Sequence, residues 1–132
     1  MKVTYNGLTI TDEETTIQRV YELLTAELSN ANVTFSTIEK AIQSSLCVSV
    51  YDGKDLVGFV RVISDYSAVS IILDAVIDPK YRSRGVGRKL FEFVHNHPRL
   101  RHTAKVLWTN NGEKFFTALG YVPLSGTLLS LK

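Results

Sequence analysis

The fold of this chain is constrained most by residues 69–96, where an apolar run passes through a basic, glycine-bearing turn into an amphipathic pattern. Val69–Ile77 is mostly apolar and predicts a buried strand, and Leu90–Asn96 carries apolar residues at helical spacing. The first N–H groups of a helix have no partner within it, and the helix dipole favours negative charge there. A strand, a turn and a helix in this order therefore predict an anion-binding site in the turn.

The turn, residues 78–89, has the composition that a phosphate or pyrophosphate site requires. Gly85 and Gly87 have no Cβ, so the backbone there can come close to a ligand. Basic side chains surround these glycines at Arg82, Arg84 and Arg88. Arg-Gly-Val-Gly alone would fit a charged surface turn equally well, so the flanking residues have to decide between the two interpretations.

Two common phosphate-binding loops do not fit this turn. The nucleoside-triphosphate loop needs Lys-Ser or Lys-Thr after its last glycine, whereas Gly87 is followed by Arg88 and Lys89. The dinucleotide fingerprint needs a third glycine at position 90, which is Leu90. The turn therefore matches neither of these two classes of phosphate site.

The pattern Arg82-x-x-Gly85-x-Gly87 resembles the Arg/Gln-x-x-Gly-x-Gly/Ala signature of the GNAT superfamily of N-acetyltransferases. That signature binds the pyrophosphate of acetyl-coenzyme A. The preceding Val76-Ile77-Asp78-Pro79, together with Tyr81, favours this resemblance over a charged surface turn. The run Leu56–Asp65 is also similar to small bacterial members of the superfamily.

The order of expected elements agrees with the same resemblance over nearly the whole chain. At 132 residues we expect one domain, 1–132, of the α/β class. The resemblance implies a mixed, mostly antiparallel sheet with a central splayed parallel strand pair, flanked by about four helices. The expected strands are 3–5, 47–51, 56–63, 69–77, 104–108, 121–122 and 127–131, and the expected helices are 11–28, 36–44, 90–96 and 112–119.

Composition excludes several classes of partner. The net charge of +2 is too small to suggest nucleic acid, and no run of about 18 apolar residues exists to span a membrane. We therefore expect a cytoplasmic protein. The lone Cys47 lies in an apolar run and is expected to be a core residue, and no His, Cys, Asp or Glu spacing indicates a metal site. Val106 and Trp108 are expected in the core.

The resemblance implies where acetyl-coenzyme A would be held. Arg82 or Lys89 is expected to reach a further phosphate, unless either side chain is simply solvated. The pyrophosphate would accept hydrogen bonds from the backbone N–H groups around Arg84, Gly85, Val86, Gly87 and Arg88.

The strand before the turn is expected to supply the chemistry. In the family this strand has a bulge and splays from the next one, so that the amide-rich arm of the carrier pairs with its free edge. The backbone N–H groups near Val76 and Ile77 would stabilise the oxyanion while their side chains pack in the core. Asp74 interrupts the apolar strand and is either a base for the amine, direct or through water, or a structural carboxylate.

Two positions near the last helix complete the expected site. Family members often have a tyrosine that protonates the departing thiolate, but the matching position here is Phe116, which has no hydroxyl. Phe116 is therefore expected to pack or to line the carrier. Asn111 would contact the carrier or cap the helix.

The sequence thus predicts an enzyme, an acetyl-CoA-dependent N-acetyltransferase that acetylates a primary amine by direct transfer in a ternary complex. The acceptor would be a small-molecule or peptide amine, bound by the first two helices, residues 64–67 and the C-terminal strands. A homodimer is compatible with this fold. Because Phe116 lacks the acid, the alternative is a catalytically weak acyl-CoA or CoA-binding regulatory module.

Overall fold

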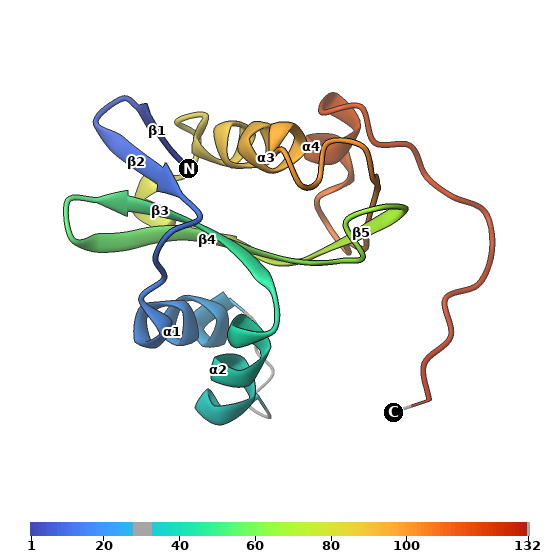
Figure 1. The fold of residues 1–132 in the computed structure, drawn as a ribbon, viewed down its shortest axis with the longest axis horizontal. Coiled ribbons are helices and arrows are strands. Elements are labelled where there is room, and N and C mark those ends of the chain that lie inside the picture. The colour runs from blue at the N-terminus through green and yellow to red at the C-terminus, as the bar shows by residue number, and fades with distance from the viewer. Residues whose placement is uncertain (28–32, 132) are drawn as a thin grey trace.

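The computed structural model describes residues 1–27 and 33–131, which form one twisted sheet with helices on both faces (Figure 1). None of the helices within these residues is long and apolar enough to cross a membrane. In chain order the elements are β1 (Lys2–Tyr5), β2 (Leu8–Thr11), α1 (Ile17–Glu27), α2 (Phe35–Gln43), β3 (Leu46–Asp52), β4 (Asp55–Ser64), β5 (Val69–Ile77), the 3-10 turn η1 (Pro79–Tyr81), α3 (Val86–Asn96), β6 (Ala104–Leu107) and α4 (Glu113–Ala118).

The sheet has the order β1-β2-β3-β4-β5-β6, so every strand pairs with its neighbour in the sequence. The first five strands are antiparallel, and β6 pairs in parallel with β5 after the crossover through α3. The predicted mixed, mostly antiparallel sheet with four helices is therefore confirmed. The parallel pair lies at the end of the sheet and not at its centre, because residues 121–131 form no strand.

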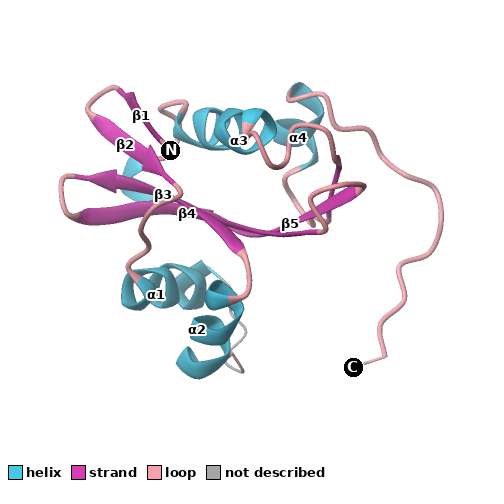
Figure 2. Cartoon of the chain, in the orientation of Figure 1, coloured by secondary structure: helices cyan, strands magenta, loops and turns pink. Residues whose placement is uncertain are grey.

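Helices α1 and α2 cover one face of the sheet, and α3 and α4 lie on the other (Figure 2). Strand β4 faces both cores, because Leu56 and Phe59 pack with α1 and α2 while Val57, Val60 and Val62 pack with α3. A strand that is apolar on both faces belongs in the interior of a sheet. The two cores together hold β4 in place and also hold β5 through Ile72 and Val76, and the site is built on these strands.

The N-terminal part differs from the prediction. Leu8–Thr11 is a strand that pairs with both β1 and β3, and Thr11 is completely buried. The first helix begins at Ile17 and not at Thr11, with Val20 N–H bonded to the carbonyl of Thr16. The predicted end of this helix at residue 28 lies outside the described residues.

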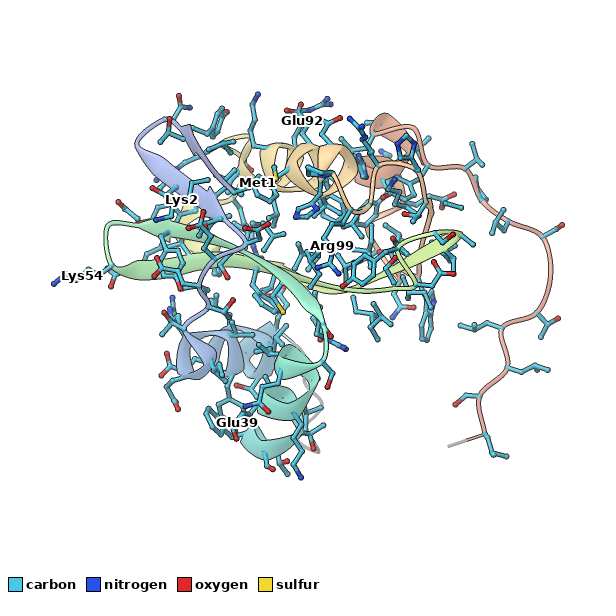
Figure 3. The ribbon with its side chains drawn as sticks, viewed as in Figure 1. Met1, Lys2, Glu39, Lys54, Glu92 and Arg99 are labelled. Atoms are coloured by element: carbon cyan, nitrogen blue, oxygen red, sulfur yellow. The ribbon has the colours of Figure 1, made fainter. Side chains whose placement is uncertain are left out.

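The C-terminal part also differs. Residues 121–122 and 127–131 form no strands, so the predicted C-terminal pair is wrong. The segment instead leads away from the sheet, with side chains drawn along its trace (Figure 3). Trp108 is 75% exposed and Val106 39% exposed, so neither is in the core. The prediction that both residues lie in the core is therefore wrong.

Candidate functional site

The site begins with a β-bulge in β5. Opposite β4, Phe59 pairs with Val76 and Arg61 with Leu73, so that Asp74 and Ala75 together face Val60. Asp74 has φ +56°, a left-handed conformation that most side chains avoid. A bulge of this kind bends the strand and redirects the side chains around it. The bulge that the family resemblance implied is therefore present.

Near the bulge, the pairing of β5 with its second neighbouring strand, β6, ends. Strand β6 pairs only with residues Val69–Ile72, and it ends at Leu107. Within the described residues, 73–77 therefore face no strand on the side away from β4. Backbone groups at such an edge can accept an added extended segment. The pairing between these two strands therefore ends at Ile72, before the bulge.

Asp74 forms an ion pair with Arg61. The Nε group of Arg61 donates to Oδ2 of Asp74 at 2.8 Å, and its Nη1 group donates to Oγ of Ser45 at 3.2 Å. Both charged side chains are partly buried, with 15% and 30% of their area exposed. A partly buried carboxylate needs such a partner, and Arg61 supplies it. Arg61 is the site residue that the sequence analysis did not identify; an arginine inside an apolar strand was the available signal.

The anion-binding end of the site is the N-terminus of α3. Gly85 precedes the helix with φ +79°, and no side chain caps this end. Val86 is buried beneath the first turn, and Arg88 is exposed on it. The first N–H groups of this 11-residue helix are therefore left for an outside acceptor, and the dipole adds positive potential.

Neighbouring side chains also leave little room for a Cβ at the two glycines. A Cβ on Gly85 would lie 2.6 Å from Oη of Tyr5, and that hydroxyl donates to the carbonyl of Arg84 at 2.9 Å. A Cβ on Gly87 would lie 3.3 Å from Cζ of Phe115. Strand β1 and helix α4 thus fix the turn from two sides. The sequence analysis explained these glycines by ligand approach alone and missed Tyr5 and Phe115.

Two of the predicted basic side chains make contacts of different kinds: Arg82 contacts α1 and the end of β5, and Arg84 contacts Tyr81 within the turn. Arg82 donates from Nη2 to Glu27 at 2.7 Å and from Nε to the carbonyl of Ile77 at 3.0 Å. The guanidinium carbon Cζ of Arg84 lies 5.2 Å from the ring centre of Tyr81. Arg82 is therefore not a purely solvated side chain, and it connects the end of α1 to the end of β5.

Lys89, the other basic side chain that was expected to reach a phosphate, forms an ion pair with Glu92 at 3.2 Å. Its Nζ group also lies 5.4 Å from the ring centre of Tyr5. The first contact is within α3, and the second is with the last residue of β1.

Phe116 lies in an aromatic group between α3 and α4. Its ring centre is 5.1 Å from that of Phe91 and 5.7 Å from that of Tyr121. The Tyr121 hydroxyl lies 2.7 Å from Nε2 of His95. Burial lowers the pKa of His95 and raises the pKa of Tyr121 to about 12, so the pair is neutral at pH 7. Phe116 therefore packs against other aromatic side chains, which is one of the two roles predicted for it; the other was to line the carrier.

Val76 and Asn111 have different surroundings. The Val76 side chain is buried in the core beneath α1 and α2, as predicted for this side chain. Asn111 is exposed, and α4 is preceded by Gly112 with no side-chain cap. The Gly112 N–H group bonds to Oγ1 of Thr109 at 2.9 Å. The capping role considered for Asn111 is therefore wrong.

Comparisons with known proteins agree with this geometry. Residues 43–123, more than half of the chain, match the family model described as an acetyltransferase (GNAT) domain. A Xanthomonas campestris pv. campestris protein described as belonging to the GNAT family has a TM-score of 0.82 at 23% identity, over 92% of this chain and 93% of that one. The comparison with curated proteins gives no match.

Two further solved structures share the fold at lower identity. Glucosamine-6-phosphate N-acetyltransferase from Arabidopsis thaliana has a TM-score of 0.68 at 17% identity, over 93% of this chain and 97% of that one. Rv2747 from Mycobacterium tuberculosis, solved in complex with CoA, has a TM-score of 0.73 at 16% identity, over 92% of this chain and 76% of that one. At these identities the likeness extends to the fold.

Gly85→Ala should destabilise the protein more than Gly7→Ala. Both glycines have a left-handed φ, which costs an L residue about 1–2 kcal/mol. Only Gly85 also faces an atom, Oη of Tyr5, whereas nothing lies within 4 Å of a Cβ on Gly7. Urea unfolding of both variants should give an excess of about 1 kcal/mol or more for Gly85→Ala. Adding Tyr5→Phe should reduce that excess; equal losses for the two glycines would refute the packing role.

Cys47 should react slowly with iodoacetamide in the folded protein. Burial raises the pKa of its thiol from 9.0 to about 11, which lowers the thiolate fraction at neutral pH about 100-fold. Mass spectrometry should show alkylation at pH 7.5 at least about 100-fold faster in urea than in the folded protein. Similar rates in the two conditions would show that this thiol is accessible and not part of the core.

Proposed function

Because this chain belongs to the GNAT acetyltransferase family, we propose that it is an acetyl-CoA-dependent N-acetyltransferase that acetylates a primary amine by direct transfer. The observation that carries the proposal is the continuity of two open backbone surfaces. The unpaired edge of β5 at 73–77 leads through a short turn into the uncapped N-terminus of α3. One surface suits an amide-rich arm and the other suits a pyrophosphate.

The pyrophosphate of the carrier would accept hydrogen bonds from N–H groups at the start of α3. Arg88 is exposed on the first turn of this helix, where its charge adds to the dipole. Arg84 extends the positive surface beside Tyr81. Arg82 would reach a phosphate only by exchanging its exposed ion pair with Glu27, and such surface pairs contribute about 0–1 kcal/mol.

The transfer step needs an oxyanion site and a base. The amine nitrogen attacks the thioester carbon, the C–S bond breaks, and the thiolate leaves with the pair of electrons. Backbone N–H groups near Val76 and Ile77, just after the bulge, would stabilise the negative oxygen of the intermediate. Asp74 would take the proton from the amine, directly or through a water, while Arg61 keeps its carboxylate in a fixed orientation.

The leaving thiolate does not require a tyrosine at position 116. A thiol of the cysteine type has a pKa of about 8.5, so its anion is a reasonable leaving group near neutral pH. Phe116 instead fills the aromatic group between α3 and α4. The acceptor would be a small-molecule or peptide amine that enters beside Asp74.

Arg88→Glu should weaken acetyl-CoA binding. The substitution puts a negative charge where the helix dipole favours an anion, and a loss of about 1 kcal/mol corresponds to about fivefold in Kd. Calorimetry should show at least this change. Arg101→Glu, which alters an exposed arginine beyond the other end of α3, is the control and should bind like the parent. Equal affinities in both variants would place the pyrophosphate elsewhere.

Asp74→Asn should lower turnover and leave acetyl-CoA affinity nearly unchanged. The amide keeps an oxygen that can accept from Arg61 but loses basicity, so we expect a loss of at least about tenfold at pH 7. Partial recovery should appear at high pH, where more of the amine is unprotonated. The rate should be followed by CoA release over a panel of polyamines, aminosugars, amino acids, arylamines and peptides.

The same panel separates the enzyme from a carrier-binding module. If the parent binds acetyl-CoA but releases no CoA with any amine, the transferase proposal is wrong and the binding proposal stands. If the rate of CoA release by Asp74→Asn equals that of the parent from pH 6 to 9, Asp74 is not a base. Its role is then the structural ion pair with Arg61.

A further inference from the structure

The basic side chains around the start of α3 differ in the contacts that they make. Arg82 and Lys89 each form an ion pair with a glutamate, at 2.7 Å and 3.2 Å. Arg84 and Arg88 are exposed, and neither forms an ion pair with any residue that the structure describes. These two arginines are therefore the cations of the turn whose charge an anionic ligand can meet without displacing a carboxylate.

Arg84 lies over an aromatic ring. Its guanidinium carbon Cζ is 5.2 Å from the ring centre of Tyr81. The attraction between a cation and a ring stabilises the position of the guanidinium without using any of its five N–H donors. Those donors match the geometry of a phosphate group, which they can bind through two parallel hydrogen bonds. Arg84 is thus positioned by Tyr81 while its hydrogen-bonding groups stay open.

The ring of Tyr81 is itself fixed from two sides. Its hydroxyl donates to Oδ2 of Asp52 at 2.5 Å, and Asp52 is the last residue of β3. The ring also packs against the core that β4 shares with α3. A carboxylate that accepts from the phenol hydroxyl makes the ring more electron-rich, which strengthens its attraction for a cation. Asp52 therefore supports the contact between Tyr81 and Arg84.

The backbone on both sides of Arg84 is constrained as well. Ser83 has φ +62° and Gly85 has φ +79°, so a left-handed residue stands on each side. The carbonyl of Arg84 accepts a hydrogen bond from Oη of Tyr5 at 2.9 Å. A left-handed conformation at a residue other than glycine costs free energy, and such residues cluster at ligand sites. The main chain of Arg84 is thus fixed before any ligand binds.

The place of Arg84 separates it from the N–H groups that suit a pyrophosphate. Those groups belong to the first turn of α3, and Arg88 lies on that turn. Arg84 precedes the cap residue Gly85, and its guanidinium lies at Tyr81 of η1, next to the β3–β4 hairpin that carries Asp52. Coenzyme A has a further phosphate outside its pyrophosphate, the monoester on the 3′ oxygen of its ribose. A phosphate monoester has between one and two negative charges near neutral pH.

We propose that Arg84, positioned by Tyr81 and Asp52, binds the 3′-phosphate of coenzyme A and selects this carrier over 3′-dephospho-coenzyme A. The N–H groups at the start of α3, together with Arg88, bind the pyrophosphate that both molecules have. Arg84 is then a specificity-determining residue, and Tyr81 is a positioning residue that acts through it. This inference rests on the proposed function, because it takes acetyl-CoA as the carrier.

Calorimetry with CoA and with 3′-dephospho-CoA tests the inference. The parent should bind CoA at least about fivefold more tightly, because only CoA has the group that Arg84 recognises. Arg84→Gln should lose this preference by weakening the binding of CoA alone. Arg88→Gln is the matched control, since it removes an equally exposed arginine of the same turn. It should weaken both ligands by about the same factor and keep their ratio.

Two variants of Tyr81 separate positioning from a merely structural role. Tyr81→Leu removes the ring, and it should lower the ratio of the two affinities while the Kd of 3′-dephospho-CoA stays the same. Tyr81→Phe keeps the ring but loses the bond to Asp52, so its ratio should lie between those of the parent and Tyr81→Leu. A structural role would instead change both Kd values together. Circular dichroism should show that both variants are folded.

The outcomes distinguish this inference from the proposed function. Equal affinities of the parent for the two ligands, or an Arg84→Gln variant that binds both more weakly by one factor, would overturn the role of Arg84 and leave carrier binding intact. A parent that binds neither ligand would refute the proposed function, and this inference with it.

Discussion

The bulge at Asp74 is the constraint on which the rest of the site depends. A left-handed φ at a residue other than glycine costs about 1–3 kcal/mol, so something must hold it. The partly buried ion pair with Arg61 does so from the adjacent strand, while Val76 returns to the core one residue past the bulge. The same distortion occurs where β6 leaves β5. An open strand edge, a fixed carboxylate and a turn toward α3 therefore arise together.

The turn before α3 is held by contacts from three directions. Tyr5 of β1 packs against Gly85, and Phe115 of α4 lies against Gly87. Helix α1 reaches the turn through Arg19, which pairs with Asp78, and through the pair between Glu27 and Arg82. The start of α3 is thus positioned before any ligand arrives, which lowers the ordering cost of binding. Helix α1 is thus in direct contact with the turn through two ion pairs.

Local patterns were predictable from the sequence, and pairings between distant segments were not. Strand β5 and the glycine turn were found because their residues are neighbours in the chain. Strand β2 was missed because Leu8–Thr11 is short and Thr11 also resembles a helix cap; its role comes from pairing with β3. The partner of Asp74 is 13 residues away, and the contact of Gly85 is on β1. Thr127–Leu131 has strand-like residues, but a strand also needs backbone pairing with a neighbour, which propensity alone does not provide.

Amide hydrogen exchange with and without CoA tests the central claim most directly, because it reports on backbone N–H groups without altering any side chain. The account predicts that CoA slows exchange in two segments, 73–77 along the open edge of β5 and 85–88 at the start of α3. Exchange in β1 and β2 should stay the same. Protection that appears elsewhere, or saturating CoA that leaves both segments unchanged, would contradict the claim that these two backbone surfaces bind the acyl carrier.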